Sequence, residues 1–229
     1  MLLNLLRNAG SLSWWLVLAM LISYAALVFL MLPLHECAHG LAAYWLGDRT
    51  AKWQGRLTLN PLRHLDPVGA IMLVLFGFGY AKPVPINPRY FKDPRKGMAL
   101  TAAAGPLSNL LLAFLGALLY RLTLLLLPIV STEFLLKFIL ILASFFAAFH
   151  YLNLSLCVFN MIPLPPLDGS RILYIFLPPR LYFRIMKYER VIMIILLAAL
   201  WLGAFSGLIN VIVNAISNGM LWLISLLIP

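Results

Sequence analysis

Apolar residues along the chain fall into long blocks that are separated by shorter polar stretches. A helix needs roughly 20 residues, each rising about 1.5 Å, to cross a bilayer. Four blocks reach that length, at residues 14–46, 98–127, 132–159 and 191–213. The first block contains Pro33, which predicts one long kinked helix, because a division there would leave the second half too short to cross. The pattern therefore predicts about four full spans.

Two further apolar segments do not fit this description. Residues 68–80 are too few to cross and contain three glycines, which predicts a re-entrant or interfacial hairpin whose backbone must be buried by protein. Residues 214–229 are apolar and predict a half-inserted C-terminal tail. The expected fold class is an all-α polytopic membrane protein with about four full spans, this short hairpin and this tail.

The composition supports a location in lipid. The chain is 63% hydrophobic and 10% charged, whereas about a quarter of the residues of a soluble domain are charged. A net charge of +10 is typical of some nucleic-acid-binding proteins, but 14 of the 17 Lys and Arg residues lie in three polar stretches, at residues 47–67, 82–96 and 161–190. In membrane proteins such loops face the cytoplasm. We expect a multi-pass protein of the cell membrane with its N-terminus outside, its basic loops cytoplasmic and no nucleic-acid partner.

The first apolar block contains His35, Glu36 and His39, an HExxH pattern. Residues four apart on a helix differ by about 40° in direction, so both imidazoles face one way and can hold one metal ion. The carboxylate of Glu36, on the adjoining face, can take a proton from a water at the metal and pass it to a leaving amine. Two packed core histidines are the alternative, but each ionisable group in lipid costs about 2.5 kcal/mol or more. The pattern therefore predicts a zinc site.

A catalytic zinc ion usually has three protein ligands, so a third is needed. Asp168 follows a proline-rich run at residues 163–167, whose extended course lets an acid point inward. The alternative for Asp168 is the N-cap of a helix that begins near Ser170. His64 and Asp66 are reserve ligands, although turn formation and a satisfied loop histidine are the commoner roles for such residues.

The unusual polar residues are expected at one depth. His39 lies about eight residues before the end of its helix, roughly 12 Å from the cytoplasmic edge. The segment from Gly105 to Asn109 begins at a similar depth in the second span, and Asn160 and Asp168 lie near the cytoplasmic end of the third. Asn160 is a candidate for stabilising an oxyanion and Asn109 for binding a substrate backbone. Hydrogen bonding between helices is the alternative for both.

At these residues the chain resembles the site-2 protease family, the intramembrane zinc metalloproteases. The resemblance rests on His35-Glu36-x-x-His39, on Gly105-Pro106-x-x-Asn109 and on Asn160 followed by the proline-rich run to Leu167-Asp168-Gly169. Residues 59–69 and 81–85 are similar to the compact bacterial and archaeal branch. The resemblance spans roughly residues 33–172.

The resemblance implies that His35, His39 and Asp168 bind zinc and that Glu36 is the catalytic base. It also implies that Asn160 lies beside the scissile carbonyl and that the substrate is a transmembrane helix. The chain departs from many family members because no inserted PDZ domain and no C-terminal CBS pair are recognisable in it. Substrate choice is therefore expected to depend on the membrane part, with residues 68–80 as one candidate.

These observations predict a single membrane-embedded protease domain over residues 1–229, with a metal-binding core at 33–172 and C-terminal helices at 190–229. The expected activity is zinc-dependent cleavage of transmembrane segments near the cytoplasmic face. A zinc-binding scaffold or chaperone without proteolysis is the alternative. A divalent-metal transporter would need ionisable residues in the outer halves of the spans, where only Arg121 and Lys137 lie.

Overall fold

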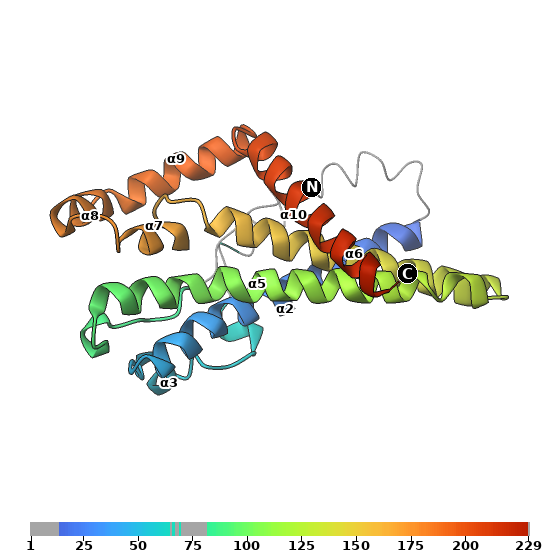
Figure 1. Ribbon diagram of the computed structural model, residues 1–229, viewed down its shortest axis with the longest axis horizontal. Helices are drawn as coiled ribbons and strands as arrows, with labels where there is room; N and C mark the ends of the chain where they lie inside the picture. The colour runs from blue at the N-terminus through green and yellow to red at the C-terminus, as the bar shows by residue number, and fades with distance from the viewer. Residues whose placement is uncertain (1–13, 65, 67–68, 70–81, 229) are drawn as a thin grey trace.

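A computed structural model describes residues 14–64, 66, 69 and 82–228, and in these ranges the chain is helical with no β-strand (Figure 1). The four longest helices there are α2 (Trp14–Trp45), α5 (Pro94–Leu124), α6 (Glu133–Asn160) and α10 (Ser206–Leu227). The shorter ones are α3 (Thr50–Trp53), α7 (Asp168–Leu173), α8 (Pro179–Met186) and α9 (Glu189–Trp201), with 3₁₀ turns η2 (Pro61–Arg63), η3 (Pro88–Tyr90) and η4 (Leu127–Ile129). The hairpin expected at residues 68–80 lies, except for Gly69, outside the described residues.

The first three long helices, α2, α5 and α6, have bounds close to those of the first three apolar blocks. Helix α2 is continuous across Pro33, as expected for one long helix. Within the described residues, three helical segments are long and apolar enough to cross a membrane: Pro94–Ile129, which joins α5 to η4, then α6 and α10. The 3₁₀ turn η4, which contains Pro128, separates the second and third blocks. The chain is therefore a membrane protein built from helices.

The expectation of one continuous span over residues 191–213 is wrong. Helix α9 ends at Trp201, and Gly203 has a φ of 75°, a left-handed conformation that glycine adopts readily. The Gly203 N–H donates to the Leu200 carbonyl and the Ala204 N–H to the Ala199 carbonyl, which is the Schellman pattern that ends a helix. Helix α10 then starts at Ser206, so residues 214–227 of the expected half-inserted tail belong to a 22-residue helix.

Helix α5 lies at the centre of the bundle and contacts α2, α6, α7 and α10. Figure 1 shows α5 and α6 side by side along the long axis. Close approach is possible because α5 presents small residues: a Cβ added at Gly116 would lie 2.8 Å from the backbone nitrogen of His150 on α6. Small residues at such contacts are the usual way in which membrane helices pack. Helix α10 completes the core, where Val213 packs with Ala113, Leu154 and Val158.

The polar stretches meet at one end of the bundle. In Figure 1 the short helices α3, α7 and α8 lie at the same end as the start of α5. Among the contacts that join these stretches, Trp53 and Tyr90 meet edge to face, and the Arg95 guanidinium lies over the Tyr174 ring at 5.6 Å. This arrangement agrees with the expectation that the basic stretches share one side. Which side of the membrane they face stays a prediction.

Candidate metal centre

Three side chains from two distant parts of the sequence converge between α2 and α7. His35 Nε2 lies 3.1 Å from His39 Nε2, and the Asp168 carboxylate oxygen Oδ2 lies 3.3 Å from both imidazole nitrogens. All three side chains are largely buried, with exposed fractions of 7%, 8% and 14%. Among the described residues these three form the one group of His, Cys, Asp or Glu that is compact enough to hold a metal ion.

The spacing of these atoms fits zinc. Ligand atoms about 2.0–2.1 Å from a tetrahedral zinc ion lie about 3.4 Å from one another. The three separations of 3.1, 3.3 and 3.3 Å form a nearly equilateral triangle of this size. Two imidazoles and one carboxylate are also the donor set of several catalytic zinc sites, in which a fourth position stays open. The residues present therefore match the expected ion in both geometry and chemistry.

A hydrogen bond to the backbone of α5 fixes the orientation of the His39 ring. Its Nδ1 lies 2.7 Å from the carbonyl oxygen of Thr101, which can only accept, so Nδ1 carries the proton and donates. The Nε2 atom is then left with a lone pair that faces the cluster. This arrangement is typical of metal-binding histidines. His35 Nδ1 is buried and has no partner among the described residues, so the two imidazoles are supported unequally.

Asp168 is the first residue of α7, while Leu167 takes the N-cap position without a side-chain hydrogen bond. The alternative of a capping role for Asp168 is therefore wrong, and its side chain turns to the histidines. Burial acts to raise the pKa of Asp168, but the imidazoles of His35 and His39 outweigh it and hold that pKa below its usual value. Gly169 lets the segment fold back, because a Cβ there would lie 2.6 Å from the Ile162 carbonyl oxygen.

Gly105 on α5 packs against one side of the cluster. A Cβ at this position would lie 2.5 Å from Cε1 of His39 and 2.6 Å from Cε1 of His35, and it would collide with His39 Nε2. The backbone of α5 therefore packs directly on both imidazoles. This contact explains why the Gly-Pro segment lies at the depth of the HExxH motif, as the sequence predicted.

Glu36 lies beside the histidines and is 9% exposed. Its Oε2 accepts a hydrogen bond of 2.9 Å from the backbone N–H of Val84. No pattern in the sequence predicts this contact apart from the Pro-Val-Pro spacing at residues 83–85. The carboxylate is therefore held by backbone from a different stretch and is not one of the three converging ligands.

The two asparagines behave differently. Asn109 is fully buried one turn beyond Gly105, and neither its Oδ1 nor its Nδ2 has a partner among the described residues. Asn160, the last residue of α6, donates from Nδ2 to the Leu156 carbonyl at 3.0 Å, within its own helix. Within the described part of the chain, neither forms the interhelical hydrogen bond that was the alternative. Their roles toward a substrate stay predictions.

The reserve ligands lie elsewhere. His64 is fully buried, and its Nε2 is 2.7 Å from the Thr58 carbonyl oxygen. The Asp66 carboxylate accepts from the Gly69 N–H at 3.0 Å. Neither belongs to the metal-binding group, so the loop roles considered for them are favoured. Asp48 is also fully buried and accepts from backbone N–H groups of Thr50 and Asn87.

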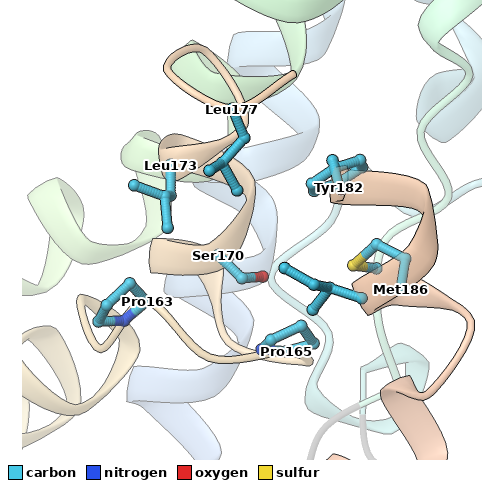
Figure 2. A pocket seen from close by; sticks show the side chains of 8 residues that line it. Pro163, Pro165, Ser170, Leu173, Leu177, Tyr182 and Met186 are labelled. Atoms are coloured by element: carbon cyan, nitrogen blue, oxygen red, sulfur yellow. The ribbon is translucent and has the colours of Figure 1, made fainter. Parts of the chain in front are cut away.

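Helix α8 supports the Asp168 segment from the opposite side. Figure 2 shows a small apolar pocket between the two, in which Tyr182 and Met186 of α8 face Leu173 and Leu177. Ser170 also lines it, and its hydroxyl donates to the Leu167 carbonyl at 2.7 Å. Tyr182 stacks on Tyr174 with ring centres 3.9 Å apart. Through these contacts α8 packs against the segment that contains α7, a helix of only six residues.

Comparisons with known proteins were made for the whole chain. Residues 129–203 match the family model described as Peptidase family M50. The chain is 47% identical over 169 residues to YwhC of Bacillus subtilis, named as a candidate zinc metalloprotease, and the alignment covers 74% of this chain and 72% of YwhC. It is 33% identical over 144 residues to Rip2 of Mycobacterium tuberculosis and 29% identical over 143 residues to Rip2 of Mycolicibacterium smegmatis, which carry the same description. Each Rip2 alignment covers 60% of this chain and 51% of the relative. No solved structure matches the chain.

Proposed function

The chain belongs to peptidase family M50, the site-2 proteases, and is a metalloprotease; from this premise we propose that it cleaves transmembrane segments of other membrane proteins. We further propose that cleavage takes place near the cytoplasmic face, within a multi-pass protein of the cell membrane whose N-terminus is outside. The basic stretches at one end of the bundle support this orientation.

One observation supports the proposal most directly: His35, His39 and Asp168 form a buried triangle of zinc-sized dimensions, with Glu36 beside it. Two of these ligands come from a long apolar helix, and the backbone of a second membrane-spanning helix covers them at Gly105. A buried cluster of ionisable groups is costly in lipid, so its presence there favours a functional role.

Zinc bound by these three side chains would polarise a carbonyl and lower the pKa of a water to about 7. Glu36 would take a proton from the attacking water and deliver it to the leaving amine. Asn160 would donate to the developing oxyanion with the second N–H of its Nδ2, since the first donates to the Leu156 carbonyl. Asn109 would use its unpaired amide to bind the extended backbone of the substrate.

The test is cleavage of a panel of candidate transmembrane substrates by purified protein, with zinc content measured on the same samples. Glu36→Gln should retain zinc and lose cleavage, because the ligand triangle is intact but no base remains. Glu133→Gln is the matched control, since Glu133 is exposed at the start of α6 and pairs only with Lys137. Equal cleavage by wild type and Glu36→Gln would refute the role of Glu36 as the base. Zinc binding by the wild type without cleavage of any substrate in the panel would support the scaffold alternative.

A further inference from the structure

A buried arginine lies close to the candidate base without touching it. Arg56 follows α3 in the first basic stretch and is 7% exposed, unlike the exposed Arg63 a few residues later. Its Nη2 donates to two successive backbone carbonyls, those of Lys82 and Pro83, the latter at 3.2 Å. Burial of a guanidinium is costly unless it makes such charge-assisted hydrogen bonds. These two hydrogen bonds offset the cost of burying Arg56, and they hold both carbonyls in place.

These carbonyls belong to an extended segment, residues 82–87, which we call the strap. The strap is tied at both ends: the Lys82 N–H donates to the His64 carbonyl at 2.7 Å, and the Asn87 N–H donates to the Asp48 carboxylate at 2.6 Å. His64 and Asp48 are themselves fully buried. The polar stretch at residues 47–64 therefore forms a frame that fixes the strap.

The centre of the strap presents a single donor. Pro83 and Pro85 have no N–H and keep the backbone extended, so the Val84 N–H is the one amide donor between them. This N–H donates to Glu36 Oε2 at 2.9 Å. The Pro83 carbonyl and the Val84 N–H belong to one planar peptide unit, in which they point in opposite directions. Arg56 donates to the carbonyl on one side of that unit, and Glu36 accepts from the N–H on the other side.

We infer that Arg56 is a positioning residue, which orients the Glu36 carboxylate for proton transfer through the peptide unit between Pro83 and Val84. The guanidinium fixes the tilt of this unit and polarises it, which strengthens the hydrogen bond on the far side. Because the Val84 N–H holds Oε2 of Glu36, the other carboxylate oxygen, Oε1, is left to accept the proton of the attacking water. The inference rests on the proposed function, in which Glu36 is the base.

The experiment measures kcat, KM and zinc content for purified variants on a substrate that the wild type cleaves. Arg56→Gln removes the charged donor. Arg56→Lys keeps the charge but loses the planar guanidinium. Arg63→Gln is the control from the same polar stretch. A second pair separates the N–H from the side chain: Val84→Pro removes the donor, whereas Val84→Ala keeps it and loses only the buried methyl groups.

A positioning role predicts that kcat of Arg56→Gln falls about ten- to a hundredfold while KM and zinc content stay at the wild-type value. Arg56→Lys should fall less, Arg63→Gln should match wild type, and Val84→Pro should lose more kcat than Val84→Ala. An unchanged kcat in Arg56→Gln, a rise in KM alone, or a loss of zinc together with activity would each overturn the inference. Absence of cleavage by the wild type on every substrate would count against the proposed function instead.

Discussion

Replacement of Gly105 by alanine tests whether the α5 backbone is in contact with the metal ligands. The new methyl carbon would lie 2.5 Å from His39 Cε1, 2.6 Å from His35 Cε1 and closer still to His39 Nε2. Unbonded heavy atoms pack comfortably at about 3.5–4.0 Å. The two imidazoles, or α5 itself, must therefore move by about 1 Å to admit a single methyl group.

The consequence for zinc follows from the tolerance of its bonds. A workable site keeps each ligand within about 0.2 Å of its ideal distance, so a shift of about 1 Å removes at least one of the three ligands. Loss of a supporting contact alone costs about ten- to a hundredfold in affinity. Gly105→Ala should therefore weaken zinc binding by at least about a hundredfold.

The assay is competition for zinc against a chelator, run on detergent-purified protein beside a thermal unfolding curve. Two glycines serve as controls. A Cβ at Gly116 would press on the α6 backbone far from the cluster in sequence, so Gly116→Ala should lower stability and leave zinc affinity unchanged. A Cβ at Gly219 meets nothing within 4 Å, so Gly219→Ala should change neither.

The reasoning would be refuted by a Gly105→Ala protein that binds zinc as tightly as wild type. It would also be refuted if Gly105→Ala and Gly116→Ala lost zinc to the same extent, because the effect would then reflect general loosening of α5. The specific contact requires a large loss of zinc at position 105 and none at position 116.

Two further predictions address the third ligand and the last helix. Asp168→Ala should lose most of its zinc at matched folding, measured by elemental analysis after gel filtration; full retention would show that another group completes the shell. Ser217→Ala removes the partner of His150 Nε2, which lies 2.7 Å from the Ser217 hydroxyl, and should lower the unfolding free energy by about 0.6–2 kcal/mol in denaturation experiments. Ser225→Ala is its control, because that hydroxyl bonds only to Trp222 within α10, and equal losses in both variants would contradict the prediction.

The cluster of His35, His39 and Asp168 could be predicted from the sequence for two reasons. The two histidines are related by one helical turn, and ionisable residues are costly to bury in so apolar a chain. The spacing of His35 and His39 is set by one helical turn, and an acid after three prolines has few inward-facing alternatives in so apolar a chain. The long apolar blocks likewise fixed the approximate bounds of α2, α5 and α6, because their lengths match a membrane thickness.

The break between α9 and α10 was not predicted, for a physical reason. Hydropathy stays high through residues 202–205, so the block looks continuous, while the helix is ended by backbone geometry at Gly203. A glycine inside an apolar run is common in membrane helices, so it carries little warning. The burial of Asp48, Arg56 and His64 was not predicted, because their partners are backbone groups that leave no pattern in the sequence. Asp48 and Arg56 pair with the strap, and the His64 ring pairs with the Thr58 carbonyl.

The same reasoning gives Asn109 more weight than its sequence position alone. In the described part of the chain its amide is fully buried with both polar atoms unpaired, although burial of such a group without partners costs about 1–3 kcal/mol. His150, a comparable polar residue inside the bundle, is satisfied at both nitrogens by Ala113 and Ser217. A packing role would have given Asn109 similar partners. Because Asn109 lies one turn beyond Gly105, which touches both imidazoles, the unpaired amide supports the proposal that Asn109 binds a substrate backbone beside the metal centre.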